Sequence, residues 1–247
     1  MIAEDRMEIS LQPIVSVSRG QSVAFDILTR VDLPDLGQVH LKRIAIGGAL
    51  DPVDFDMSMF LVAVDTARRR MGSVSERMRL HLSLSPDVLR HEEAVADICA
   101  LVDLHPGIAR SMVLSLPGTA ARHPDLARAA RALSDAGMAL ALDSDGSTIH
   151  ADNGLPPLQY VNVEAQVLIA LADTMDIGTL DDLWARIWPG ACPPIIALGV
   201  RAEETALRLI DLGVDLMAGD WFSPPRRMSR GDPHLAHGQE GGRPTLG

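Results

Sequence analysis

The chain of 247 residues places polar side chains near the ends of several short apolar runs. Carboxylates at such positions can hold divalent cations, and a cation-bound water can hydrolyse a phosphodiester. Two of these residues are carboxylates, but serines and a leucine occupy most of the others, which argues against a catalytic metal centre. The positions are Asp26, Ser83, Ser115, Asp143, Ser144, Asn162 and Leu198.

Other motifs that could bind metal or phosphate fail on their spacing. His91-Glu92-Glu93 lacks a second histidine four residues on, so a polar helix face explains it better than zinc. The stretch Asp143 to Gly146 resembles the start of a calcium loop, but the twelfth position is Gly154 and not a glutamate. The nucleotide-binding motifs GxxxxGK[ST] and GxGxxG are absent. We therefore expect neither a metal nor a cofactor.

Composition excludes several classes of protein. The 33 acidic residues exceed the 22 lysines and arginines, and the net charge of −11 argues against a protein that coats nucleic acid or anionic membranes. Cys99 and Cys192 lie far apart without a CxxC pairing, which suits a reducing cytoplasm. No apolar run reaches the roughly 18 residues of a membrane span, and no signal peptide is visible at the start. The sequence predicts a cytoplasmic protein without a membrane span or a nucleic acid polymer as partner.

The elements that position these residues follow from hydrophobic periodicity. Two apolar runs at 9–18 and 22–31 are joined by the tight connection Arg19-Gly20-Gln21, which predicts an antiparallel strand pair. A helix is predicted over 53–71. From residue 79 onward, short branched apolar runs alternate with amphipathic stretches. Strands are predicted at 79–85, 111–117, 138–144, 160–164, 194–200 and 215–223, with helices at 86–102, 123–136, 179–187 and up to 212.

About eight such strands, each apolar nearly throughout, are typical of a closed parallel barrel covered by helices. The predicted fold is an α/β, modified (β/α)8 TIM barrel whose first strand pair is antiparallel. Residues 1–225 form this one domain. The tail 226–247 is rich in Gly, Pro, Arg and His, and is predicted to be disordered.

Seven segments, in order, resemble a family. Residues 11–30, LQPIVSVSRGQSVAFDILTR, resemble the opening YQPI followed by the EALLR signature of EAL domains. The chain is similar to a degenerate EAL domain, a barrel family of cyclic di-GMP phosphodiesterases and their inactive relatives, which include TipF-like regulators of flagellar polarity. The other segments are LSLSP (82–86), VLSLPG (113–118), ALDSDG (141–146), VNVE (161–164), ALGVRAEE (197–204) and LGVDLMAGDWFSPP (212–225).

The resemblance implies a site of two divalent cations in active members, held by glutamates, aspartates and an asparagine with a lysine nearby. The seven positions given above replace that set, and a glutamine of the closing run becomes Ala218. Only Asp143 matches an active-site ligand unchanged. The loop from Ser144 to Asn153 also departs from the family pattern and is about two residues shorter. The resemblance therefore implies loss of hydrolysis.

Some positions that the family uses to hold cyclic di-GMP without metal are retained. Arg30 matches an arginine that faces a phosphate, and a guanidinium can bind phosphate through two hydrogen bonds. The alternative is that Arg30 pairs with an internal carboxylate and that Asp56 caps a helix. The candidate ligand-binding residues are Gln12, Arg30, Asp56, Phe222 and Pro225, together with Pro13 and Pro224.

Three functions are consistent with these residues. The first is a catalytically inactive signalling adaptor that acts by binding another, unidentified protein. The second is a metal-free cyclic di-GMP receptor, whose binding could be the input to the first. The third is weak residual phosphodiesterase activity. The oligomeric state is left open.

Overall fold

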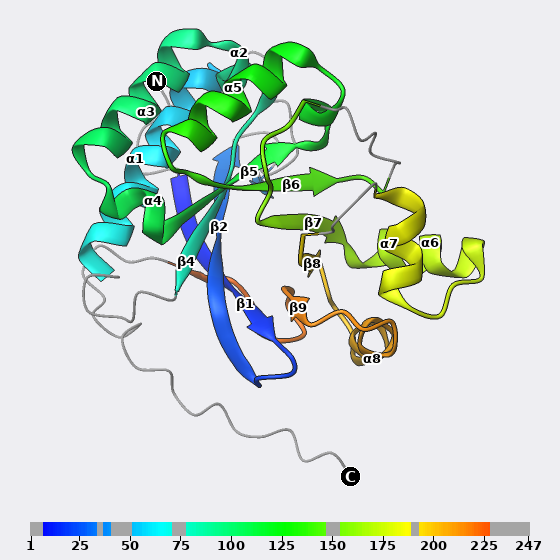
Figure 1. Ribbon diagram of the computed structural model, residues 1–247. Helices are drawn as coiled ribbons and strands as arrows, with labels where there is room; N and C mark the ends of the chain where they lie inside the picture. Colours follow the sequence, from blue (N-terminus) through cyan, green and yellow to red (C-terminus); the bar gives the residue numbers. More distant parts are fainter. Residues whose placement is uncertain are drawn as a thin grey trace.

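The computed structural model describes residues 7–33, 37–40, 51–70, 78–146, 154–188 and 193–227. Their strands close a barrel (Figure 1). The first two strands pair antiparallel around the turn 17–20, and the later strands pair in parallel, each with the next. The wall consists of β1 (Met7–Ser16), β2 (Gln21–Leu33), β4 (Arg79–Ser83), β5 (Met112–Pro117), β6 (Ala139–Ser144), β7 (Tyr160–Glu164), β8 (Ile195–Leu198) and β9 (Leu216–Met217).

The ring closes where β9 meets β1 antiparallel, with Val15 opposite Met217. Eight strands in one closed ring, with an antiparallel first pair, confirm the predicted α/β barrel. Two short strands extend the sheet: β3 (Gly37–His40) pairs with the end of β2, and β10 (Arg226–Arg227) pairs with β1. Arg226 and Arg227 of the predicted tail thus pair with β1, and residues 228–247 lie outside the described part of the chain.

Helices cover the outside of the wall, and polar caps fix where several of them begin. The Asp51 carboxylate accepts hydrogen bonds from the amides of Val53 and Asp54 at the start of the first helix. Thr179 accepts one from Asp182 in the same way. The helices are α1 (Pro52–Arg70), α2 (Pro86–Arg90), α3 (Glu92–Leu104), α4 (Gly107–Ser111), α5 (Pro124–Asp135), α6 (Ala165–Met175), α7 (Leu180–Ile187) and α8 (Glu203–Asp211), with the 3-10 helix η3 (Gly118–Ala121).

The observed helices differ from the predicted ones in several places. The helix predicted at 86–102 is broken into α2 and α3 at His91, whose Nδ1 accepts a hydrogen bond from the Ala94 amide and so caps the second helix. Between β7 and α7 the chain also forms α6, which was not predicted. None of the helices among the described residues is both long and apolar enough to cross a membrane.

The hydrophobic core lies between the wall and the helices, in two parts. One part packs α1 to α5 against the strands from β1 to β6, and the other packs α6 to α8 against β7, β8 and β9. Trp188 contacts both parts. Side chains of the wall that do not join these parts alternate with those that do, so they face the barrel interior. The packing thus decides which residues reach the inside.

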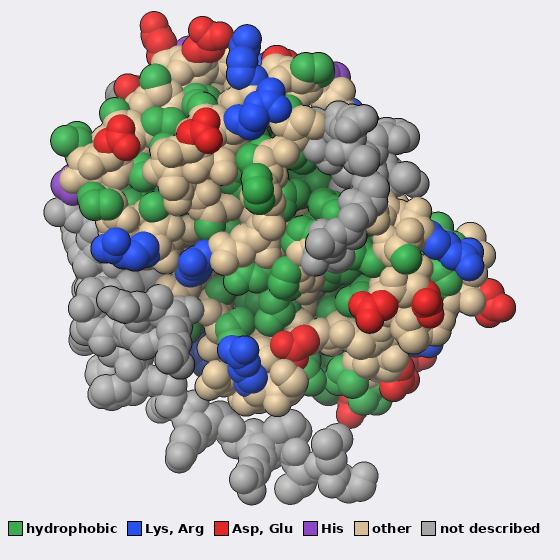
Figure 2. Space-filling model, in the orientation of Figure 1, with side chains coloured by type: hydrophobic (Ala, Val, Ile, Leu, Met, Phe, Trp, Pro, Cys, Tyr) green, Lys and Arg blue, Asp and Glu red, His purple; other side chains and the backbone are tan. Residues whose placement is uncertain are grey.

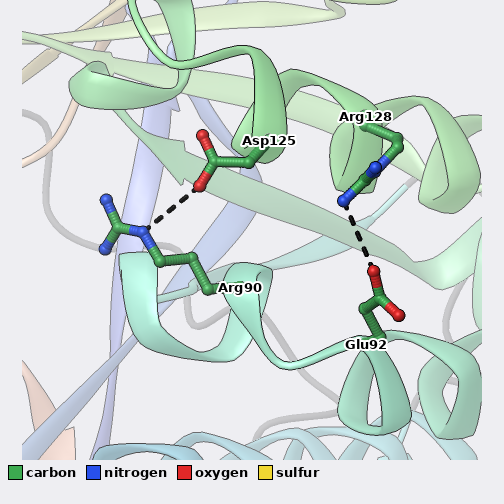
Figure 3. A network of polar contacts seen from close by, with 4 residues as sticks. All are labelled: Arg90, Glu92, Asp125 and Arg128. Atoms are coloured by element: carbon green, nitrogen blue, oxygen red, sulfur yellow. Dashed lines mark hydrogen bonds and ion pairs between the residues drawn. The ribbon is translucent and has the colours of Figure 1, made fainter.

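Exposed ion pairs join α2 to α5 and α3 to α5 (Figure 3). Arg90 at the end of α2 lies 3.3 Å from Asp125 at the start of α5, and Arg128 of α5 lies 3.3 Å from Glu92 of α3. Because all four side chains are exposed, solvent screens both pairs and they contribute little to folding. The buried contacts, and not these pairs, hold the helices in place.

Candidate functional site

The C-terminal ends of β4 to β8 form one rim of the barrel, which we call the mouth. Alternation along the strands turns Ser83, Ser115, Asp143 and Asn162 inward, because their neighbours Leu82, Leu114, Leu142 and Val163 belong to the outer cores. Register then brings them side by side, with Ser83 opposite Ser115 and Asp143 opposite Asn162. Four of the predicted positions therefore meet at the mouth.

Hydrogen bonds connect these four side chains. Asn162 Nδ2 donates to Asp143 Oδ1 at 2.8 Å and to Ser115 Oγ at 3.0 Å. Ser83 Oγ donates to the other carboxylate oxygen, Asp143 Oδ2, at a long 3.5 Å. Ser115 and Asn162 are buried, at 2% and 4% exposure, whereas Ser83 and Asp143 are half-buried. Both oxygens of the Asp143 carboxylate therefore face donors within the protein.

The backbone supports this arrangement at Gly118, the residue after β5. A Cβ on Gly118 would lie 2.6 Å from the carbonyl oxygen of Asp143, which is closer than carbon and oxygen can approach. Because Gly118 has no side chain, the end of β5 can lie this close to the end of β6. A glycine at position 118 thus helps to hold Asp143 against Asn162.

The donor set does not fit a pair of divalent cations. Cations of this kind need several carboxylate or histidine ligands at one point. The Asp143 carboxylate is turned to an amide and a hydroxyl, and Asn162 presents its NH2 group, which cannot bind a cation. Among the described residues no three His, Cys, Asp or Glu side chains gather as a metal site.

The amide oxygen of Asn162 is the unsatisfied atom of the network. Asn162 Oδ1 is buried and has no hydrogen-bond partner. Turning the amide over would place this oxygen against the Asp143 carboxylate, where two acceptors repel each other. The observed orientation therefore makes two hydrogen bonds and leaves one acceptor atom, Oδ1, without a partner. In proteins, buried water often donates a hydrogen bond to such an atom.

The other predicted metal positions lie apart from this network. Asp26 is buried on β2, with Gln12 opposite it on one side and His81 on the other. Ser144 accepts a hydrogen bond from the Gly146 amide in its own turn. Leu198 packs on the small apolar cluster inside the barrel. The rest of the loop after Ser144, residues 147–153, lies outside the described residues.

Gln12 is held by the closing segment of the chain. Its Nε2 donates to Asp220 Oδ1 at 3.1 Å and to the Ser223 carbonyl oxygen at 3.4 Å. Gln12 is also nearly buried. Its amide donor is therefore engaged within the protein, and it links the first strand to the turn after β9.

Asp56 links α1 to the start of α2. Its carboxylate accepts a hydrogen bond of 2.6 Å from the Ser85 amide, and Ser85 Oγ in turn caps α2 by accepting from Val88. Burial raises the pKa of Asp56, and the hydrogen bonds from Ser85 only partly oppose this effect, while the nearby Asp87 adds to it. Asp56 thus lies within α1 and bonds the residue before α2, and its predicted contact with a ligand stays a prediction.

Of three further ligand-binding candidates, the structure describes the side chains of two and only the backbone of the third. Phe222 is half-buried against the core of α6 to α8, and Pro225, three residues later, is also half-buried. Arg30 lies on β2 opposite Glu8 and His40, but its side chain lies outside the described residues. Its predicted phosphate contact therefore stays a prediction.

Two residues that the sequence analysis did not single out contribute to the interior. The rings of His81 on β4 and Tyr160 on β7 lie 5.3 Å apart, a contact across the barrel. Both are inward positions by the two-residue period of their strands. The two-residue period of a strand does not predict where Asp220, the partner of Gln12, points, because Asp220 lies in an irregular turn.

The closed α/β barrel, its antiparallel first pair and the polar side chains at its mouth define the class of this domain. The model of the EAL domain family matches residues 1–225, and the chain belongs to this family, whose members bind or hydrolyse cyclic di-GMP. No match was found among curated protein sequences.

Solved structures agree with the fold. The chain resembles the PaMucR phosphodiesterase in its cyclic di-GMP complex, with a TM-score of 0.71 at 18% identity over 90% of this chain and 92% of that one. The EAL domain of Mycobacterium smegmatis DcpA gives 0.66 at 15% identity, over 89% and 93%. The EAL enzyme Bd1971, bound to cAMP and cyclic di-GMP, gives 0.61 at 18% identity over 90% of this chain, which spans only 62% of that enzyme.

Proposed function

We propose that this EAL domain does not hydrolyse cyclic di-GMP and acts as a regulatory domain that binds a partner protein. The observation that carries the proposal is the network in which Asn162 donates to Asp143 and Ser115. Hydrolysis at neutral pH needs a metal-activated water, and this network offers donors where a cation would need acceptors. A barrel that keeps its fold without this chemistry is suited to regulation by binding.

Metal-free binding of cyclic di-GMP is the second part of the proposal, as an input to the regulatory role. Family members such as PaMucR are found in complex with this dinucleotide. Arg30 is the side chain that we expect to meet a phosphate, because a dianionic ligand needs positive charge where cations are lacking. If this binding is itself the main function, the domain is a receptor and needs no protein partner.

The setting of this activity is part of the same proposal. Cys99 is a free thiol, which suits a reducing cytoplasm. Control of flagella, motility or polarity, as in TipF-like regulators, is the kind of output that we propose for an inactive EAL domain.

Two measurements on purified protein test the proposal. We expect no turnover of cyclic di-GMP with magnesium or manganese, and turnover that disappears in Asp143→Ala would contradict the loss of hydrolysis. Calorimetry with cyclic di-GMP, with and without EDTA, tests the proposed metal-free binding. Binding should survive EDTA and weaken by about ten- to a hundred-fold in Arg30→Ala. Binding that EDTA abolishes would contradict the metal-free part.

A further inference from the structure

Apolar side chains are unusually exposed around α8. Leu207 and Ile210 on this helix are 49% and 41% exposed, and Trp221 in the turn after β9 is 46% exposed. Among the described residues, the other two large apolar side chains with such exposure are Leu61 and Leu104, on α1 and α3. Three of the five thus gather on one short helix and the turn beside it.

One flank of α8 is already occupied by α6. Gln166 Nε2 of α6 donates to Thr205 Oγ1 at 3.5 Å, and Arg208 lies 2.7 Å from Asp173 at the other end of α6. Thr205 and Arg208 are three positions apart, so they share one side of α8. The α6 helix therefore covers that side.

Helix geometry places the exposed leucine and isoleucine on the opposite flank. Ala206 and Leu209 are buried and fix the side that faces the core. At 100° per residue, Leu207 and Ile210 then lie on the side opposite α6, next to the buried face. No helix follows α8 among the described residues, because the chain continues into β9 and the closing turn. Among the described residues, no later helix covers this flank.

Trp221 lies at the start of the same helix. Its backbone N–H donates to the Val200 carbonyl oxygen at 3.1 Å, and Val200 precedes Glu203, the first residue of α8, by three positions. We call Leu207, Ile210 and Trp221 the α8 patch. A patch of this kind rimmed by polar residues marks an interaction surface.

Negative charge surrounds the α8 patch. Acidic side chains lie in the first turn of α8, at its end, and beside Trp221, and all are exposed. Only two cations oppose them on this stretch: Arg201, and Arg208, which Asp173 already binds. Figure 2 shows acidic side chains around apolar ones over the part of the surface that α6, α7 and α8 form. The acidic residues are Glu203, Glu204, Asp211 and Asp220.

We propose that the α8 patch binds a basic amphipathic helix of a partner protein. This inference rests on the proposed regulatory role through protein binding, and it names the chemistry of the partner. Leucine-like side chains at helical spacing would cover Leu207 and Ile210, and lysines or arginines would meet Glu203 and its neighbours. A second copy of this chain would bring the same negative charge to the patch, so its own α8 is a poor occupant.

The test uses a fluorescein-labelled synthetic helix of leucine and lysine, with leucines three and four positions apart. Its binding to the full chain is measured by fluorescence anisotropy, beside a peptide in which glutamate replaces every lysine. The double variant Leu207→Ser with Ile210→Ser removes the patch. Its matched control is Leu61→Ser with Leu104→Ser, which removes leucines at least as exposed, on α1 and α3. Both variants should fold, because no buried side chain changes.

We expect the basic peptide to bind and the Kd to rise at least about tenfold in the α8 variant, with less than about a twofold change in the control. Glu203→Gln with Glu204→Gln should also weaken binding, and salt should weaken it further. Equal loss in both serine variants, binding of the glutamate peptide, or no binding of the lysine peptide would overturn the proposal. Turnover of cyclic di-GMP by the same preparation would instead contradict the proposed loss of hydrolysis and leave the peptide result standing.

Discussion

Asn162 is the residue on which the chemistry of the mouth depends. Its amide donates to a carboxylate on β6 and a hydroxyl on β5, so a neutral side chain on β7 joins three strands. Hydrogen bonds of this kind stabilise only one arrangement of donors and acceptors. The identity of residue 162 therefore decides whether Asp143 is bound by the protein or offered to a ligand.

Asn162→Asp tests this arrangement with almost no change of shape. The variant places a second carboxylate against Asp143 in a buried site and removes two hydrogen bonds. We expect the free energy of unfolding at neutral pH to fall by about 3 kcal/mol, and to recover in part at acidic pH, where one carboxyl group is protonated. Urea unfolding at both pH values measures this. Wild-type stability at neutral pH would show that Asn162 and Asp143 do not interact as described.

Asp56→Asn tests the buried carboxyl that links α1 to the start of α2. Because the pKa of Asp56 is raised in the folded state, its contribution to stability is present at low pH and is lost as the pH rises above the unfolded value of 3.8. Asparagine keeps an oxygen for the Ser85 amide without the charge. The free energy of unfolding of the variant, relative to the wild type, should therefore increase from acidic to neutral pH in urea titrations. A constant difference across this range would contradict the role of burial.

The mouth could be predicted in part from the sequence. Ser83, Ser115, Asp143 and Asn162 share a position near the end of a strand, and the period of two turns them to one side. Which of them touch depends on the register between strands, and register is set by packing that a single strand does not show. The Gln12 to Asp220 contact could not be foreseen for the same reason, since 208 residues separate its two partners.

At the scale of elements, hydrogen bonds connect the β1–β2 hairpin to Asp215, the residue before β9. The Ser16 hydroxyl and the Ser18 amide both donate to the carboxylate of Asp215, at 2.9 and 2.8 Å. Burial alone would raise the pKa of Asp215, but these hydrogen bonds, with Arg19 nearby, lower it below the ordinary value. The charged carboxylate thus helps to close the barrel.

Asp215→Asn should weaken this fastening in a pH-dependent way. Because the pKa is lowered in the folded state, the stabilisation is present above the unfolded value of 3.8 and is lost as the pH falls through the folded value. We expect the variant to lose about 1 kcal/mol at neutral pH and to equal the wild type in strong acid. The pH series of urea unfolding checks both, and its trend should be opposite to that of Asp56→Asn. A loss that persists in acid would show that shape, and not charge, matters at this site.

The elements themselves were predictable wherever a break separates them. The strands at β5, β6 and β7 agree within a residue with those predicted, because glycine, proline or polar runs bound them. The α6 helix was missed because Ala165 follows the last residue of β7 directly, with no turn residue to mark a new element. The break at His91 was missed because histidine is an uncommon cap.

At the scale of the whole molecule, two contacts between distant segments complete the wall. The pairing of β9 with β1 closes the ring, and β10 then adds Arg226 opposite Leu11. Alternation of strands and helices predicted the number of strands in the ring but could not supply the closing contacts.

Truncation tests where the domain ends. A chain that stops at residue 227 should melt at the temperature of the full chain, because the sequence of 228–247 has too few apolar residues to offset the ordering of its backbone. A chain that stops at residue 225 also loses the pairing of β10 with β1, and we expect its melting temperature to be lower by a few degrees. Equal melting of the two truncated chains would show that β10 contributes nothing to stability.

The central claim is that protein hydrogen bonds, and not cations, organise the mouth of this barrel. Calorimetric titration of the full chain with manganese, in the presence of cyclic di-GMP, tests it most directly. We expect no saturable binding of manganese below millimolar concentrations, with the same trace for Asp143→Ala and the wild type. Micromolar binding of two ions that Asp143→Ala abolishes would contradict the claim.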